Sequence, residues 1–199
     1  MKKARLCRRA DLPARRWAAI CALLLGLLPA LAWAQDDYAP PEPETYREDN
    51  YRSPVPRTLR GAETVDTAEL IRRRSELVVI DVLPQMARPP RLAPENVWLP
   101  PPHIGIPGSF WLPNVGYGLL PPVLVDYFTE ALRSFSGGDF DRPLVFYCRS
   151  ECWMSWNAAK RALTLGYRHV LWYRDGIEAW QAAGQPTEVL KPFRDGPPV

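Results

Sequence analysis

Two cysteines stand four positions apart in the segment Cys148-Arg-Ser-Glu-Cys152. A thiolate is a nucleophile and a soft metal ligand, and two neighbouring thiols can close a disulfide. The pair follows the apolar run 144–147 and precedes a helical pattern that starts at Ser155. Free backbone N–H groups and the dipole of such a helix stabilise a thiolate and lower its pKa. We therefore expect Cys148, at the end of the run, to be the more reactive thiol. A disulfide that only closes the loop is the competing interpretation.

The elements that must position these cysteines are visible as apolar runs alternating with helical patterns. Strands buried on both faces are predicted over 77–80, 144–147 and 169–172. Helices are predicted over 67–74, 123–135, 155–165 and 176–183. Prolines crowd residues 83–122 and exclude a regular helix there. The alternation predicts an α/β domain with a parallel sheet, in which ligands lie at the carboxyl ends of the strands, where Cys148 is expected.

The first 34 residues have the organisation of a secretory signal peptide. A basic stretch up to Arg16 precedes an apolar run over 17–28, and Ala32-Trp-Ala34 provides a cleavage site. The apolar run is shorter than the roughly 20 residues that a membrane-spanning helix needs. We therefore expect a signal peptide over 1–34 and export to a bacterial periplasm, with no membrane attachment after cleavage.

Cleavage would change the composition of the remaining chain. Residues 1–34 hold seven of the 25 Lys and Arg residues and one of the 22 Asp and Glu residues, so the rest is net negative. That balance excludes a nucleic-acid footprint. Cys7 and Cys21 would also leave, and in an oxidising compartment Cys148 and Cys152 are expected to form a disulfide. Residues 35–60, rich in Pro and Glu without apolar periodicity, are expected to be a linker or a wrapping arm.

The cysteine segment and the residues after it resemble the C-terminal half of a rhodanese domain. The residues that carry the resemblance are Tyr147-Cys-Arg149, Ala158-Ala159, Gly166-Tyr167, Asp175-Gly176 and Gly184-Gln-Pro186. Upstream, Ile80-Asp-Val82 and the segment 103–109 resemble the N-terminal half. The resemblance spans roughly 64–187. It implies the rhodanese-like three-layer α/β fold with a central parallel sheet, in a domain over 61–190 followed by a tail over 191–199.

Two further features resemble a narrower group of exported proteins. Cys152 is followed directly by Trp153, and Ser155-Trp-Asn157 comes next. These residues look like the CXXCW-motif family associated with catabolism that depends on pyrroloquinoline quinone (PQQ), although three residues separate the cysteines here. That resemblance implies a periplasmic PQQ-dependent alcohol dehydrogenase, or its cytochrome, as a partner.

The rhodanese resemblance implies a persulfide cycle in which Cys148 takes a sulfane sulfur. A neighbouring thiol at Cys152 would resolve the persulfide, giving a disulfide and releasing sulfide. The expected activity is sulfurtransferase or thiol-disulfide oxidoreductase, on a small sulfur-containing substrate or a protein thiol, without a cofactor. Candidate substrate-binding residues surround the pair: Arg149, Ser150, Glu151, Trp153, Met154 and Ser155.

Two other functions remain open from the sequence. Thiolates and a thioether suit Cu(I), so the two cysteines could bind copper together with Met154 and His169. Alternatively, the domain is a non-catalytic binding module stapled by the Cys148–Cys152 disulfide. Trp153 and Trp156 flank the loop and either pack in the core or form a docking face.

Overall fold

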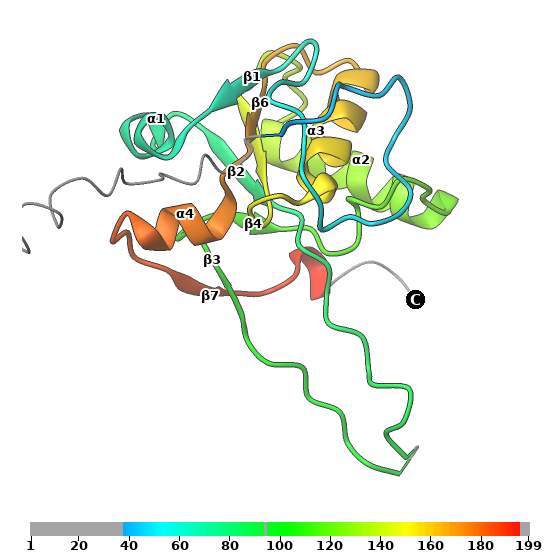
Figure 1. The fold of residues 1–199 in the computed structure, drawn as a ribbon. Coiled ribbons are helices and arrows are strands. Elements are labelled where there is room, and N and C mark those ends of the chain that lie inside the picture. Colours follow the sequence, from blue (N-terminus) through cyan, green and yellow to red (C-terminus); the bar gives the residue numbers. More distant parts are fainter. Residues whose placement is uncertain (1–37, 94, 196–199) are drawn as a thin grey trace, which may run out of the picture. The chain divides into compact units, whose positions relative to one another are not determined.

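The computed structural model describes residues 38–93 and 95–195 (Figure 1). The predicted signal peptide over 1–34 and the end of the predicted tail lie outside the described residues. The elements are β1 (Glu63–Val65), α1 (Thr67–Arg73), β2 (Val78–Asp81), β3 (His103–Gly105), β4 (Phe110–Trp111), α2 (Pro122–Ser136), β5 (Leu144–Tyr147), α3 (Trp153–Thr164), β6 (Val170–Tyr173), α4 (Gly176–Ala182), β7 (Glu188–Leu190) and a short 3₁₀ helix, Phe193–Asp195.

Five strands form a parallel sheet in the order β1-β6-β5-β2-β4. In its centre, Asp81 at the end of β2 is opposite Tyr147 at the end of β5. A separate antiparallel pair joins β3 to β7. The α/β class with a central parallel sheet, expected from the alternating pattern, is therefore confirmed.

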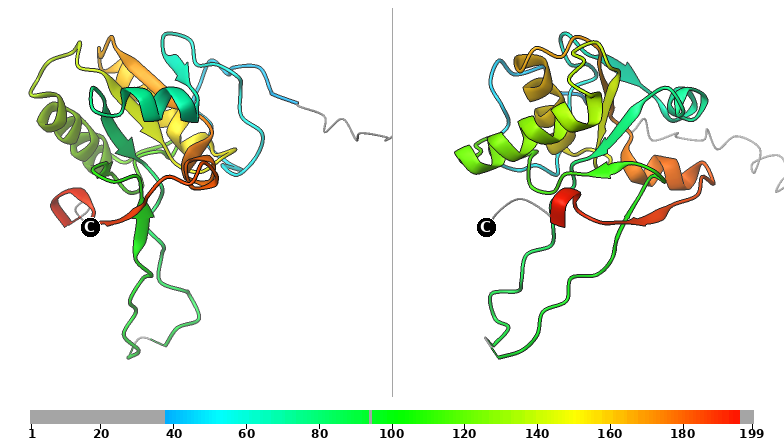
Figure 2. Two further views of the ribbon diagram at one scale, coloured as in Figure 1. Left: turned by 90° about the vertical axis from the view of Figure 1, so that its left-hand side faces the viewer. Right: turned by 180° about the vertical axis from the view of Figure 1, so that it is seen from behind.

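Alternating side chains of the central strands supply a core on each face of the sheet. From β5, Leu144 and Phe146 pack with α2 and α3, whereas Val145 and Tyr147 pack with α1 and α4. All four side chains are fully buried. Helices α1 and α4 consequently cover one face and α2 and α3 the other, which gives three layers (Figures 1 and 2).

The helix after the cysteine loop begins earlier than predicted. The pattern indicated a start at Ser155, but α3 begins at Trp153 with the extended Cys152 as its N-cap residue. Ser155 is inside the helix, where its hydroxyl accepts a hydrogen bond from the Trp172 indole at 3.0 Å. This buried interaction with β6 outweighs the capping preference of a serine.

Among its described residues, the proline-rich segment contains no helix before α2. It includes two strands that the sequence did not reveal, β3 and β4, each of two or three residues. Their partners, β7 for β3 and β2 for β4, are distant in sequence, so local patterning could not indicate them. Between β2 and β3 the chain leaves the sheet as a long loop, residues 84–102, called the excursion below (Figure 1).

The segment before the domain lies along α3 rather than apart from it (Figure 1). Residues 46–53 of this segment are called the arm below. After the arm, Val55 and Leu59 are buried in the same core as α3. Within the part of the chain that the structure describes, no helix combines the length and apolarity needed to cross a bilayer.

Candidate functional site

The loop between β5 and α3 holds both cysteines, and hydrogen bonds to α4 hold this loop in place. The Cys148 carbonyl accepts a hydrogen bond from the Ile177 N–H at 3.0 Å. The Ser150 N–H donates to a Glu178 carboxylate oxygen at 3.0 Å, and the Arg149 guanidinium donates to the other oxygen. The loop is therefore held by the first turn of α4, at the carboxyl edge of the sheet.

Gly176 allows this close approach. Its φ of +70° lies in the left-handed region, and a Cβ there would come within 2.4 Å of the Arg149 carbonyl carbon. Any side chain would push α4 away from the cysteine loop. The Asp175-Gly176 pair of the sequence thus has a structural role: it lets the two elements touch.

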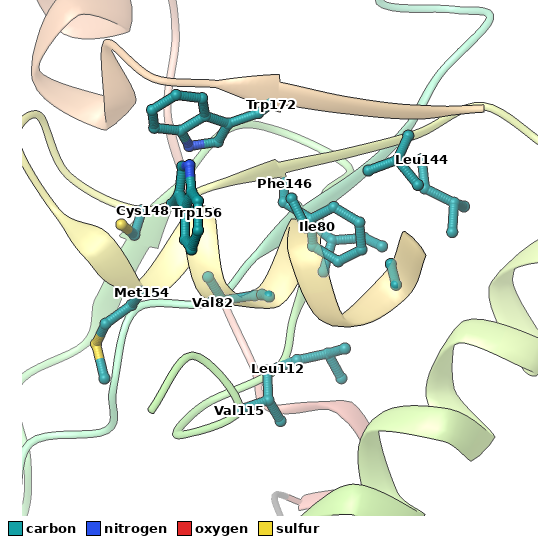
Figure 3. Close-up of a cluster of buried hydrophobic side chains, with 14 of the residues drawn as sticks. Ile80, Val82, Leu112, Val115, Leu144, Phe146, Cys148, Met154, Trp156 and Trp172 are labelled. Atoms are coloured by element: carbon teal, nitrogen blue, oxygen red, sulfur yellow. The ribbon is translucent and has the colours of Figure 1, made fainter. Parts of the chain in front are cut away.

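Cys148 is 1% exposed and belongs to the core between the sheet and α3. Figure 3 shows it among buried side chains that include Trp156 and Met154. Its thiol donates a hydrogen bond to the Cys152 carbonyl at 3.5 Å. Burial raises the pKa of Cys148 well above that of a free thiol, and contact with Cys152 raises it further. Burial of Cys148 opposes the activation expected from the loop amides, whereas hydrogen bonds from the Ser155 hydroxyl and backbone lower the pKa of Cys148. The expectation that Cys148 is the more reactive thiol stays a prediction.

Cys152 has the opposite electrostatic setting. A hydrogen bond with Cys148 is the main cause that lowers the pKa of Cys152, to about 7, although burial opposes it. Hydrogen bonds from the backbone N–H groups of Met154 and Arg149 and the positive charge of Arg52 contribute in the same direction. Backbone groups in the first turn of α3 act on both thiols, because Met154 lowers the pKa of Cys152 and Ser155 lowers that of Cys148.

A pocket of about 380 Å³ opens beside the loop. Among the described residues that line it, Cys152 is the only cysteine. Its other lining residues come from the loop, the first turn of α3, the arm, the segment that leads from β2 into the excursion, and the segment before α2: Tyr51, Arg52, Leu83, Pro84, Gln85, Met86, Tyr117, Arg149 and Met154. The volume is that of a site for a small molecule.

The predicted substrate-binding residues divide between the pocket and its supports. Arg149 and Met154 line the pocket. Ser150 is bonded to α4, and the exposed Glu151 makes the turn of the loop with a φ of 48°. Trp153 and Ser155 are buried behind the pocket, under the arm and against β6 respectively.

The arm residues that line the pocket were missed by the sequence reasoning. Tyr51 and Arg52 belong to a segment without apolar periodicity. No pattern in the sequence predicts that the folded chain places them beside Cys152. The arm pairs with the loop through a bridge between Arg52 and Cys152. In addition, the Trp153 N–H donates to the Tyr51 carbonyl at 2.9 Å, and Arg52 donates to the Ser150 carbonyl at 2.7 Å.

His169, the fourth ligand considered for copper, lies at the other edge of the sheet. It precedes β6, and its carbonyl accepts from Leu144, the first residue of β5. Cys148 follows the last residue of β5, so the length of the strand separates the two. Among the described residues, no three His, Cys, Asp or Glu side chains form a cluster that could hold a metal ion.

The sequence model of the rhodanese-like domain matches residues 64–183. The chain belongs to the rhodanese-like domain family. The matched range runs from β1 to α4 and includes the cysteine loop but not the arm. In this rhodanese-like domain, one wall of the pocket therefore comes from residues outside the family's range.

Several solved structures resemble this rhodanese-like protein. The Alr3790 protein from Anabaena sp. is 18% identical, with 63% of this chain and 80% of that chain covered and a TM-score of 0.44. Thiosulfate sulfurtransferase from Pseudomonas aeruginosa is 19% identical, with 70% and 22% covered and a TM-score of 0.44. A protein of unknown function from Rhodopseudomonas palustris is 27% identical, with 64% and 86% covered and a TM-score of 0.42. The comparison with curated proteins gave no match.

Proposed function

We propose that this rhodanese-like protein moves sulfane sulfur, or exchanges disulfides, through the Cys148/Cys152 pair. One observation carries the proposal: two thiols in contact occupy the loop at the carboxyl edge of the sheet, and one of them lines a pocket. A single thiol can hold a persulfide and pass its outer sulfur to an external acceptor, whereas a second thiol beside it can displace the sulfur itself and form a disulfide. The substrate is a small sulfur compound or a protein thiol.

The second part of the proposal concerns the cell compartment and the metabolic process in which this chemistry takes place. The signal-peptide pattern over 1–34 supports export to a periplasm. The Cys152-Trp153 and Ser155-Trp-Asn157 residues support membership of the PQQ-associated CXXCW group. We therefore place the protein as an accessory to periplasmic PQQ-dependent alcohol oxidation, acting on a dehydrogenase, its cytochrome, or a sulfur compound that either needs.

The chemical proposal is tested on the reduced protein with thiosulfate as the sulfur donor. Sulfide release should accompany the loss of two hydrogens from the protein mass as the disulfide forms. A variant with both Cys148→Ser and Cys152→Ser is the control and should do neither. Wild-type protein that remains reduced and releases no sulfide, with thiosulfate or with an organic persulfide as donor, would count against the proposal.

The biological setting needs a separate test. A strain that lacks the gene should grow poorly on an alcohol that is oxidised by a PQQ-dependent enzyme, and normally on an organic acid. Complementation with the wild-type gene should restore growth, whereas the double serine variant should not. Equal growth of all strains on the alcohol would remove the PQQ setting and leave the chemical proposal standing.

A further inference from the structure

The arm crosses the cysteine loop and is bonded to it directly. It lies at residues 46–53, ahead of the range 64–183 that matches the rhodanese-like family. A bridge pairs Arg52 with Cys152, and the Trp153 N–H donates to the Tyr51 carbonyl at 2.9 Å. The Arg52 guanidinium donates to the Ser150 carbonyl at 2.7 Å. The arm therefore pairs with the second half of the loop as an added strand would pair with a sheet edge.

Further hydrogen bonds fix the arm to the domain along its length. At its start, the N–H and carbonyl of Arg47 bind the Asn157 amide at 2.9 and 2.8 Å. In its second half, the Tyr51 hydroxyl accepts from the Gly118 N–H at 3.1 Å. At its end, the Ser53 hydroxyl accepts from the indole N–H of the first residue of α3 at 3.0 Å. The arm cannot move off the loop without breaking several of these bonds.

Both thiols are consequently closed to a large reactant. Cys148 is 1% exposed and Cys152 is 3% exposed. The pocket of about 380 Å³ reaches Cys152, and Tyr51 and Arg52 of the arm form part of its wall. A small sulfur compound fits a space of this volume. A cysteine of another protein does not, because its backbone would have to follow the sulfur into the pocket and displace the arm.

We infer that the arm is a specificity-determining segment: it restricts the Cys148/Cys152 pair to small sulfur compounds and excludes protein thiols. This inference rests on the proposed function, which leaves both substrate classes open, and it selects one of them. Thiol–disulfide exchange requires contact between the reacting sulfur atoms, so access decides which partners react. The inference holds whichever cysteine attacks first, because the loop that carries both lies under the arm.

Gly118 offers a way to displace the arm without a change in the cysteine loop. A Cβ on Gly118 would come within 2.3 Å of the Arg47 carbonyl oxygen and within 2.8 Å of the Glu48 Cγ. Both atoms belong to the arm. The φ of Gly118 lies outside the left-handed region, so its backbone accepts an alanine. Gly118→Ala should therefore push the arm outwards. The matched control is Leu119→Ala, at the next residue, whose side chain is exposed.

Two activated disulfides with the same chemistry and different size measure access to the pair. In one, thionitrobenzoate is joined to the sulfur of N-acetylcysteine, and in the other to the single surface cysteine of a small folded protein. The two thiols of the pair are oxidised to the Cys148–Cys152 disulfide. The reagent is reduced to its carrier thiol and thionitrobenzoate, and one proton is released. The coloured thionitrobenzoate gives the rate, and the double serine variant should react with neither reagent.

Each rate on folded protein is divided by the rate on the same protein unfolded in urea. For the wild type, this ratio should be on the order of a hundredfold higher for the small reagent than for the protein reagent. Gly118→Ala should raise the ratio for the protein reagent by about tenfold and change the ratio for the small reagent far less. Leu119→Ala should match the wild type. Should circular dichroism show Gly118→Ala to be unfolded, Asn157→Ala, which releases the start of the arm, replaces it.

Three results would overturn the inference. The first is a wild type that reacts equally well with both reagents, and the second is a wild type that reacts with neither. The third is a folded Gly118→Ala protein that excludes the protein reagent as well as the wild type does, because the arm would then not be the barrier.

Sulfide release from thiosulfate separates this inference from the proposed function. A wild type that releases no sulfide but reacts only with the small reagent would remove sulfur transfer and leave the size restriction standing. A wild type that releases sulfide and also reacts with the protein reagent would leave the proposed function standing and remove the restriction.

Discussion

The arm and the excursion both lie in irregular, proline-rich stretches of the chain, although the arm itself has no proline, and their contacts with the folded domain differ. The arm is bonded to α3 and the cysteine loop at several points, whereas the described residues of the excursion mostly bond within the excursion. Val97 and Leu99 of the excursion are about four-fifths exposed. Both segments nevertheless contribute walls to the pocket at Cys152, the excursion only through its first residues, 84–86. Composition alone does not decide whether an irregular segment packs against the domain. Hydrogen bonds to buried polar groups of the folded domain decide it.

Asn157 makes the most direct connection between the arm and the folded domain. Its side chain is fully buried, accepts from the Arg47 N–H at 2.9 Å, and donates to the Arg47 and Gly116 carbonyls at 2.8 and 3.0 Å. The Asn157 amide thus binds both the N–H and the carbonyl of Arg47, as a neighbouring strand would in a sheet. The amide thus fixes the arm to α3 in the turn that follows the cysteines.

The largest effect is therefore expected for Asn157→Ala. The substitution removes the bonds to the buried Gly116 carbonyl and to the partly buried N–H and carbonyl of Arg47, and we expect a loss of about 3 kcal/mol in the free energy of unfolding. Asn96→Ala, at an exposed residue of the excursion, is the matched control and should change stability by less than about 0.5 kcal/mol. Urea denaturation measures both. Equal effects would show that the arm and the excursion are held alike.

An intermediate effect is expected for Arg52→Gln. Removal of the positive charge destabilises the Cys152 thiolate, so the pKa of Cys152 should rise and its alkylation below neutral pH should slow several-fold. The profile of rate against pH should move to higher pH without loss of fold. Arg88→Gln is the control, because the Arg88 guanidinium donates to the Leu92 and Ala93 carbonyls within the excursion. An unchanged profile for Arg52→Gln would remove the arm from the chemistry of the site.

The smallest effect is expected from cutting the excursion. Limited trypsin should cleave first after the exposed Arg91, because exposed loop tips are the preferred sites of nicking. The bonds after Arg47 and Arg52 should resist longer, since their backbone is paired with α3 and the loop. The nicked protein should keep its alkylation profile at Cys152. Cleavage of the arm before the excursion would contradict the comparison.

The sequence was most informative where structure depends on neighbouring residues. The run 144–147 was predicted with the bounds that β5 has, and Asp66 caps α1 through its bond from the Glu69 N–H at 2.8 Å. The runs for β2 and β6 were each placed one residue early. Strands buried on both faces need continuous apolar residues, and such a run can be recognised from consecutive residues of the sequence. Short strands such as β4 were missed because two residues carry no pattern.

The sequence by itself therefore determined the parallel sheet, the layers around it and the position of both cysteines at its carboxyl edge. Tertiary structure decided the surroundings of each thiol. The first turn of α3 bonds to both thiols, through Met154 at Cys152 and through Ser155 at Cys148, and the arm brings the charge of Arg52 to Cys152. The core closes over Cys148. Each of these outcomes depends on groups that are distant in sequence, and a thiol's pKa depends on the balance of desolvation and hydrogen bonds that only the packed chain sets.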